Sequence, residues 1–253
     1  MPHFLRTALL SCFLVLAAGC GSTPSSEPAA NPDVTPAVDA SVPIDCGEAE
    51  VVRFTTSDDV ELVADYIPPS EPGRGVVVFF HMIPPSNDRT GFPLRVRESF
   101  SALGLGVLNV DRRGAGDSAG VALEAYEGPT AGLDVEAALR FVLADDRACV
   151  AASEKIMVVG ASNGTTSVMD YVVNRSDASL PMPAAIAWLS PGSYTENQNS
   201  IADHNDVMSV LPVLTVHPAN ETWVAQFAGY SDAWKIVTLA NGRHGTQILK
   251  TAS

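Results

Sequence analysis

The chain has 253 residues, of which 46% are hydrophobic and 17% are charged, and its formal net charge is −14. This length allows one domain with a sizeable core. Nucleic-acid binding requires basic patches, so a chain of this negative charge is expected to have no nucleic-acid partner.

The N-terminal segment predicts export and a lipid anchor. One arginine and no acidic side chain precede residues 7–16, an apolar run too short to span a bilayer. Residues 17–20 resemble a lipobox, the cleavage and acylation site of bacterial lipoproteins, with Ala17 where leucine is usual. We expect residues 1–19 to be a signal peptide and Cys20 to be lipidated. The protein would then be held at the cell envelope, on its periplasmic or outer surface; an ordinary secretory signal is the alternative.

A composition change separates this segment from the folded part. Residues 20–45 are rich in Ser, Pro, Ala and Asp, and they cannot bury enough apolar surface to offset the entropy of ordering. We therefore predict a disordered tether, followed by one domain over residues 46–253. Cys46 and Cys149 are the cysteines that remain in that domain. Two such cysteines tend to pair in an oxidising compartment, so a disulfide is expected, with two free thiols as the alternative.

The domain sequence alternates strand patterns with helix patterns. Residues 60–66 alternate apolar and polar side chains, which predicts a half-buried antiparallel strand paired with residues 51–55. Continuous apolar runs, typical of central parallel strands, follow at residues 76–80, 107–110, 156–159, 185–189, 213–216 and 236–239. Helices are predicted between them at residues 94–103, 133–143, 165–173 and 222–230. This alternation predicts an α/β sheet, whose ligands bind at the carboxyl ends of the strands.

One connection bears on substrate access. Residues 190–211 are polar, with one weakly helical piece. The segment is too short for a helical cap domain. We therefore expect an open site, or one covered only by loops.

The strongest functional signal is the motif Gly-x-Ser-x-Gly formed by Gly160, Ser162 and Gly164. A predicted strand precedes it and a predicted helix follows, the setting in which a serine sits on a strained turn with its hydroxyl exposed above a sheet. A Cβ at Gly160 or Gly164 would collide with neighbouring backbone. Ser162 is therefore the candidate nucleophile, and a plain turn serine at a glycine-rich strand end is the alternative.

A serine nucleophile needs a base, and the base needs a carboxylate that fixes its tautomer. Glu221 follows the predicted strand at residues 213–216, and His244 lies in a glycine-flanked turn after residues 236–239. The order serine, acid, histidine is the one found with this type of elbow. We predict that His244 is the general base and then the general acid, oriented by Glu221. Alternatively, Glu221 caps the following helix and His244 is an exposed loop residue.

These motifs together resemble the α/β-hydrolase superfamily over residues 51–249. Residues 76–82 are similar to the third strand and oxyanion turn of that family, and residues 109–118 to its Asp-x-Arg-Gly-x-Gly-x-Ser segment. Residues 242–249 resemble the turn of its catalytic histidine. The resemblance implies an α/β-hydrolase fold, with a mostly parallel central sheet flanked by helices and a minimal or absent cap. Some dienelactone-hydrolase-like members share the His-Met pair after the third strand.

The resemblance also implies an oxyanion hole of two backbone N–H groups. Asn163 would supply one, and Met82 or Ile83 the other, since Met82 replaces the usual glycine; His81 would shape the turn. The implied chemistry is acyl transfer to water through an acyl-enzyme, with no metal and no organic cofactor. We expect a serine hydrolase, most simply a carboxylesterase for short-chain or small esters. A peptidase or amidase of the same fold, and a catalytically silent binding lipoprotein, are the alternatives.

Overall fold

The computed structural model describes residues 44–144, 149, 151–227 and 231–250. The expected signal peptide at residues 1–19, the lipidation site Cys20 and nearly all of the tether at residues 20–45 lie outside the described residues. In the part of the chain that is described, none of the helices has the length and apolar character that crossing a membrane requires.

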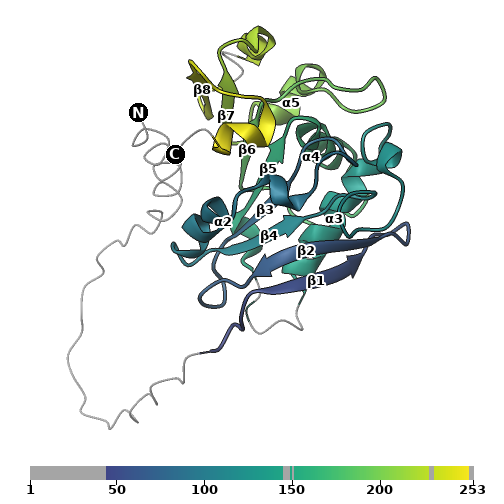
Figure 1. Ribbon diagram of the computed structural model, residues 1–253, viewed down its shortest axis with the longest axis vertical. Helices are drawn as coiled ribbons and strands as arrows, with labels where there is room; N and C mark the ends of the chain where they lie inside the picture. The colour runs from purple at the N-terminus through teal and green to yellow at the C-terminus, as the bar shows by residue number, and fades with distance from the viewer. Residues whose placement is uncertain (1–43, 145–148, 150, 228–230, 251–253) are drawn as a thin grey trace, which may run out of the picture. The chain divides into compact units, whose positions relative to one another are not determined.

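The centre of the domain is an eight-stranded sheet with the strand order β1-β2-β4-β3-β5-β6-β7-β8. It extends from β1 at the bottom of Figure 1 to β8 at the top. The strands are β1 Glu50–Thr55, β2 Glu61–Ile67, β3 Val76–Phe80, β4 Gly106–Val110, β5 Ile156–Ala161, β6 Ala185–Leu189, β7 Val213–Pro218 and β8 Trp234–Leu239. Each of the strands expected from the apolar runs is present.

The sheet is mostly parallel, as the sequence predicts. β2 pairs antiparallel with β1 and with β4, whereas all other neighbouring strands from β4 to β8 are parallel. All residues of β3, β4 and β5 are buried. Continuous apolar strands of this kind require cover on both faces of the sheet.

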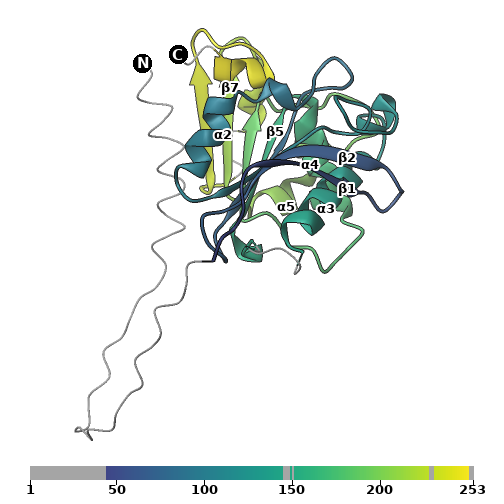
Figure 2. The same ribbon diagram turned by 60° about the horizontal axis from the view of Figure 1, so that its bottom comes forward.

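Helices provide that cover. They are α2 Leu94–Ser101, α3 Ala131–Val142, α4 Asn163–Asn174 and α5 Asn205–Met208, with 3-10 helices η1 Arg89–Gly91, η2 Ala122–Ala125, η3 Ser153–Lys155, η4 Ile201–His204, η5 Thr222–Phe227 and η6 Gly245–Lys250. Figure 2 shows α2 on one face of the sheet and α3 and α4 on the other. On the first face Phe79 packs against Phe100 of α2, with ring centroids 5.8 Å apart. On the second, Phe141 of α3 packs edge-on against Tyr66 at 5.3 Å. The predicted fold class, an α/β sheet flanked by helices, is confirmed.

The segment after β7 differs from the prediction. A helix was expected at residues 222–230, whereas the structure has only the short 3-10 helix η5 at Thr222–Phe227, and residues 228–230 lie outside the described residues. Threonine, tryptophan and valine open this segment. β-Branched and aromatic side chains lose rotamer freedom in an α-helix, so the local preference for an α-helix is weak.

The connection after β6 contains no cap domain. Residues 190–211 hold only η4 and the one-turn helix α5, joined by irregular chain. The loop between them and β6 returns to the sheet, where Gln198 and Pro191 are buried. This connection therefore places no helical cap over the carboxyl ends of the strands in the described part of the chain.

A disulfide joins Cys46 and Cys149, which are 103 residues apart in sequence. Their Cα atoms are 5.2 Å apart, within the usual range for a disulfide. Cys46 precedes β1 and Cys149 precedes β5. The bond therefore joins the segment before the first strand to the segment before β5.

Candidate active site

The backbone at Ser162 has the strained conformation expected of a nucleophile elbow. Its φ is 51° and its ψ is −125°, a positive φ that non-glycine residues rarely adopt. The Ser162 N–H donates to the Leu189 carbonyl at 2.8 Å, and α4 starts at the next residue. A Cβ at Gly160 would lie 2.9 Å from the Gly164 carbonyl oxygen, and a Cβ at Gly164 would overlap the Phe80 carbonyl. The collision expected at both glycines is thus confirmed.

Ser162, His244 and Glu221 form a continuous hydrogen-bonded chain. His244 Nε2 is 2.6 Å from Ser162 Oγ, and His244 Nδ1 is 2.6 Å from Glu221 Oε1. Because an ionised carboxylate only accepts hydrogen bonds, Nδ1 carries the proton and Nε2 is free to accept from the serine hydroxyl. The Glu221 side chain is 3% exposed and that of His244 41% exposed. The carboxylate is directed at the imidazole, so this arrangement can deprotonate the serine.

Each member of this chain follows the carboxyl end of a different strand. Ser162 follows β5, Glu221 lies in the turn after β7, where its N–H donates to the Pro218 carbonyl at 3.0 Å, and His244 follows β8. Gly245 next to the histidine has a φ of 56°, and a Cβ there would overlap the Met82 side chain. Its N–H donates to Ser190 Oγ at 2.9 Å. The parallel sheet therefore brings together three residues that are distant in sequence.

The turn after β3 is held by His81. Its Nδ1 lies 2.7 Å from the Met82 carbonyl oxygen, and its Nε2 accepts from the Arg112 N–H at 3.0 Å. Burial lowers the pKa of His81 to about 3, and the positive charge of Arg112 acts in the same direction. The imidazole is therefore neutral, with its proton on Nδ1. These contacts support the expected role of His81, which is to shape the turn.

The candidate oxyanion donors lie on two elements in backbone contact. Asn163 is the first residue of α4, and a first-turn N–H has no acceptor within its own helix. Met82 and Ile83 follow β3 after the single residue His81. A Cβ at Gly164 would meet the carbonyl oxygens of both Phe80 and His81, so the start of α4 lies against this turn. The fold thus brings the start of α4, which follows Ser162, into contact with the turn that leads to Met82 and Ile83.

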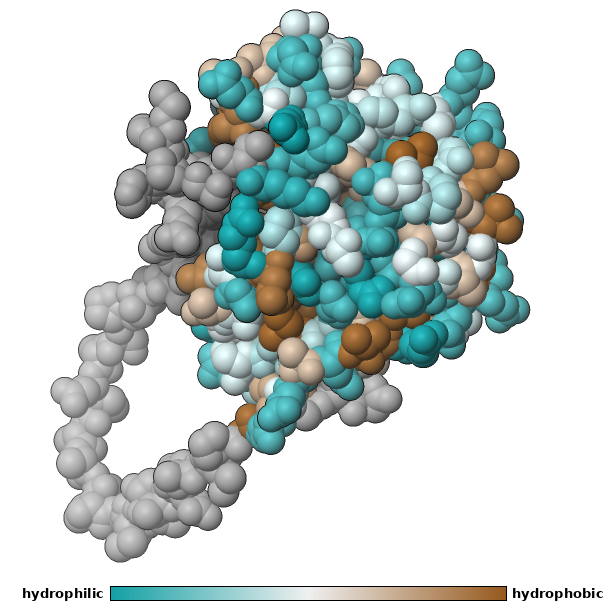
Figure 3. Space-filling model, viewed as in Figure 1, coloured by the Kyte–Doolittle hydropathy of each residue, from teal (hydrophilic) through white to brown (hydrophobic). Residues whose placement is uncertain are grey.

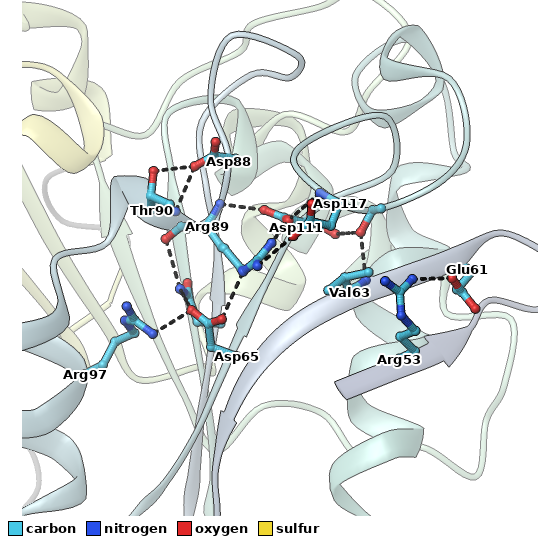
Figure 4. Close-up of polar contacts among 12 residues, drawn as sticks. Arg53, Glu61, Val63, Asp65, Asp88, Arg89, Thr90, Arg97, Asp111 and Asp117 are labelled. Atoms are coloured by element: carbon cyan, nitrogen blue, oxygen red, sulfur yellow. Dashed lines mark hydrogen bonds and ion pairs between the residues drawn. The ribbon is translucent and has the colours of Figure 1, made fainter. Parts of the chain in front are cut away.

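An ion-pair network centred on Arg89, a few residues after Ile83, anchors the chain to the end of β4 (Figure 4). The Arg89 guanidinium contacts Asp111, lies 3.0 Å from Asp65 Oδ1 and lies 2.9 Å from Asp117 Oδ2. The Arg89 N–H also donates to Asp111 Oδ1 at 2.7 Å. Burial raises the pKa of Asp111, while these N–H donors and Arg89 oppose that shift. Asp111 therefore fixes the loop by accepting from the N–H groups of Arg89 and Asp117.

Tyr194 is a member of the site that sequence reasoning missed. Its hydroxyl donates to the Ser190 carbonyl, and its oxygen lies close to the Ser162 side chain. Its ring lies edge-on to His244, with centroids 6.0 Å apart. Burial raises the pKa of Tyr194, and the Ser162 contact only partly opposes this, so the phenol stays protonated. Tyr194 lies in an irregular loop without a motif, and only its position in space identifies it.

Trp223 extends the aromatic side of the site. Its indole N–H donates to the Pro191 carbonyl at 2.9 Å, and its side chain remains half-exposed. A Cβ at Gly192 would lie 3.1 Å from the Tyr194 ring and 3.3 Å from the Trp223 indole nitrogen. The loop after β6 and the turn after β7 therefore form one wall beside Ser162.

The remaining histidines of the domain are not part of the serine-histidine chain. His217 Nε2 is 2.9 Å from Thr238 Oγ1, and His204 Nε2 is 2.8 Å from Asn199 Oδ1. Across the described ranges, His, Cys, Asp and Glu side chains form no group of three or more that could hold a metal ion.

Comparison with known proteins gives similarity in structure only. No protein-family model matches the chain, and no curated protein matches its sequence. The esterase Pf2001 of Pyrococcus furiosus superimposes with a TM-score of 0.61 at 16% identity, over 80% of this chain and 84% of that one. A dienelactone hydrolase from Anabaena variabilis gives a TM-score of 0.55 at 14% identity, over 79% and 89% of the two chains.

A third solved structure has the same arrangement of strands and helices. The esterase RhEst1 from Rhodococcus gives a TM-score of 0.52 at 12% identity, over 74% of this chain and 90% of that one. At identities this low, similarity establishes the fold and not the reaction. The strand order, the serine elbow and these neighbours together show that the protein has the α/β-hydrolase fold.

Proposed function

We propose that the protein is a serine hydrolase, and specifically a carboxylesterase that acts on short-chain or small esters. The observation that carries the proposal is the chain Ser162–His244–Glu221, with both hydrogen bonds at 2.6 Å. Geometry of this kind identifies a catalytic triad by the roles of its members and not by their sequence positions. Intact contacts at all three positions disfavour the alternative of a catalytically silent binding protein.

Acylation would proceed as follows. Ser162 Oγ attacks the ester carbonyl carbon while its proton passes to His244 Nε2. The carbonyl oxygen becomes an oxyanion and accepts hydrogen bonds from the Asn163 N–H and from an N–H of the Met82–Ile83 segment. His244 then gives its proton to the departing alcohol oxygen as the carbon–oxygen bond breaks. The product is an acyl-enzyme on Ser162.

Deacylation repeats these steps with water as the nucleophile. His244 Nε2 takes a proton from water, the water oxygen bonds to the acyl carbon, and the bond to Ser162 Oγ breaks as His244 returns the proton to that oxygen. Glu221 stabilises the imidazolium in both half-reactions without taking its proton. Each step uses only side-chain and backbone groups of this chain.

The preference for esters over amides rests on the site's construction. The described residues place no helical cap domain over the carboxyl ends of the strands, and Tyr194 and Trp223 form the wall on the β6 and β7 side. The ester-hydrolysing neighbours have the same fold. An amidase or peptidase remains the second candidate because the triad chemistry is shared.

Location is part of the same proposal and rests on the sequence. Cleavage after residue 19 would leave Cys20 as the lipidated first residue, so the enzyme would be anchored to the cell envelope. The esters that reach it there would be small extracytoplasmic molecules.

Turnover of matched esters and anilides tests the function. Wild type is expected to hydrolyse nitrophenyl acetate and nitrophenyl butyrate, and to hydrolyse the corresponding nitroanilides at least about a hundredfold more slowly. Ser162→Ala should abolish both activities. Faster cleavage of the anilides than of the esters would favour the amidase alternative. Absence of turnover in both series would contradict the proposed hydrolase function.

A further inference from the structure

Arg112 is a fully buried cation beneath the proposed oxyanion turn. It is the residue after Asp111 at the end of β4, and its exposed fraction is 0%. Its Nη1 donates to the carbonyl oxygens of His81 and Met82, each at 3.3 Å. Its Nη2 donates to Asn163 Oδ1 at 2.9 Å. One guanidinium thus contacts both elements that supply the candidate oxyanion donors.

The position of these contacts relates them to the donors themselves. In a trans peptide the C=O and the N–H point in opposite directions. The His81 carbonyl shares its peptide with the Met82 N–H, and the Met82 carbonyl shares its peptide with the Ile83 N–H. Arg112 donates to both carbonyls, so it lies behind both candidate N–H groups. A hydrogen bond to a carbonyl polarises the peptide and makes its N–H a stronger donor.

The remaining contacts of Arg112 are also to neutral oxygens. Its Nη2 contacts the Ser167 hydroxyl and the Ala125 carbonyl. The described residues include no carboxylate in ion-pair contact with it, whereas the neighbouring Arg113 pairs with Asp134 at 2.8 Å. Burial lowers the pKa of Arg112 to about 10, so it is still protonated at neutral pH. Asp134 and Asp170 oppose this shift without an ion-pair contact to Arg112. A buried cation without a directly paired carboxylate is costly, which indicates a role for its charge.

We propose that Arg112 is a positioning residue that orients and polarises the oxyanion hole. Its guanidinium fixes the His81 and Met82 carbonyls and the Asn163 side chain, and its charge strengthens the N–H groups on the opposite side of those peptides. The negative charge that develops on the substrate oxygen is then stabilised more in the transition state than in the bound substrate. This inference rests on the proposed serine-hydrolase function.

Arg112 acts on both candidate donors, the N–H groups of Met82 and Ile83. Both peptides carry a carbonyl that accepts from the same nitrogen, so both N–H groups are polarised together. His81 adds a second donor to the Met82 carbonyl at 2.7 Å. The turn is therefore fixed from its interior side before substrate arrives.

The test compares substitutions of the two neighbouring arginines in the whole domain. Arg112→Met removes the charge, Arg112→Lys keeps the charge but not the planar fork, and Arg113→Met is the control, because it removes a buried arginine that does not contact the turn. The readouts are kcat and KM for nitrophenyl acetate, affinity for a trifluoromethyl ketone, which forms a tetrahedral adduct with an oxyanion, and the thermal unfolding midpoint.

We expect Arg112→Met to lower kcat by about 10- to 100-fold with KM changed less than about threefold, and to weaken trifluoromethyl ketone binding by a similar factor. Arg112→Lys should fall between this variant and wild type. Arg113→Met should lower the unfolding midpoint but leave kcat within about threefold. A kcat and a ketone affinity for Arg112→Met that match those of Arg113→Met would overturn the proposal.

Failure of a variant to fold and failure of the proposed function can be told apart. If Arg112→Met does not fold, Arg112→Lys carries the test, and a kcat and ketone affinity equal to wild type in that variant would overturn the inference. If wild type itself has no activity that depends on Ser162, the proposed function fails. If wild type is active and the Arg112 variants have the kcat and the ketone affinity of wild type, only the role of Arg112 is contradicted.

Discussion

At the scale of residues, the site depends on which nitrogen of His244 carries its proton. The buried Glu221 carboxylate lies 2.6 Å from Nδ1, and this contact leaves Nε2 as the acceptor for the Ser162 hydroxyl. The serine is held at a positive φ on the elbow, and this backbone conformation sets the direction of its Cα–Cβ bond. We attribute the expected reactivity of the hydroxyl to this orientation.

Glu221→Gln tests this dependence on tautomer. The amide side chain has nearly the same shape, but its NH₂ group can donate to Nδ1 and favour the proton on Nε2, where it blocks the serine. We expect kcat to fall by about 10²- to 10⁴-fold, while the thermal unfolding midpoint changes little. Steady-state kinetics with nitrophenyl acetate measures the effect. A variant with more than about a third of wild-type kcat would show that another acid orients His244.

Tyr194→Phe isolates the phenolic hydroxyl from the ring. The ring would keep its edge contact with His244, whereas the hydrogen bond from the hydroxyl to the Ser190 carbonyl would be lost. One neutral hydrogen bond contributes about 0.5–1.5 kcal/mol, so kcat/KM should fall by about 2- to 13-fold. Tyr194→Leu is the control that removes the ring as well. Equal kcat/KM in wild type and Tyr194→Phe would reduce Tyr194 to a wall residue.

At the scale of elements, the strands were predictable and several of the contacts between them were not. Continuous apolar runs predicted all of the central strands, because a strand that is buried on both faces carries apolar side chains at nearly every position. The α-helix expected after β7 is instead the 3-10 helix η5, since β-branched and aromatic side chains weaken the local helix preference.

The candidate site was predicted to the extent that motifs mark it. Ser162, Glu221 and His244 each follow a strand in a recognisable order, and the structure brings their side chains together. Tyr194 and Arg112 carry no such signal. Their roles depend on where an irregular loop and the end of β4 meet the elbow, and that depends on long-range packing which periodicity does not encode.

The Cys46–Cys149 disulfide is expected to raise the free energy of unfolding. It closes a loop of 103 residues in sequence, and constraining the unfolded chain by such a loop is worth up to about 4–5 kcal/mol in the chain-entropy model. The double variant Cys46→Ala with Cys149→Ala should lose about 2–4 kcal/mol of unfolding free energy, measured by urea denaturation.

The same variant should keep its esterase activity. Cys149 precedes the amino end of β5, whereas Ser162 follows its carboxyl end, so the bond and the site lie at opposite ends of that strand. A large loss of kcat in protein that remains folded would show that the bond also shapes the site. Unchanged urea stability would mean that the bond contributes little to the folded state.

At the scale of the whole molecule, the described residues include no cap domain over the strand ends. The connection between β6 and β7 holds only η4 and the one-turn helix α5. The face seen in Figure 3 carries its apolar residues in separate groups among hydrophilic ones. Exposed large apolar side chains such as Leu94, Val121, Val210 and Trp223 come from different elements. We therefore expect a hydrolase of small soluble esters that needs no lipid interface.

Acyl-chain length tests this expectation. Each buried methylene adds about 0.8 kcal/mol to binding where a pocket encloses it, and an open site gains little of this. We predict that kcat/KM is highest for acetyl to butyryl nitrophenyl esters and falls for chains longer than about eight carbons. Assays below and above the micellar concentration of the longer esters are the control. A strong preference for long chains, or activation by micelles, would mean that the loop between β6 and β7 closes as a lid.

The most direct test of the central claim, that Ser162 is the nucleophile of a serine hydrolase, is the site of modification by a fluorophosphonate. The domain would be treated with the probe, and the labelled residue identified by peptide mass spectrometry in wild type, Ser162→Ala and His244→Ala. We predict a single adduct on Ser162, no adduct in Ser162→Ala, and labelling slowed by several orders of magnitude in His244→Ala, with ester turnover lost in parallel. An adduct on another residue, or undiminished ester hydrolysis by Ser162→Ala, would contradict the account.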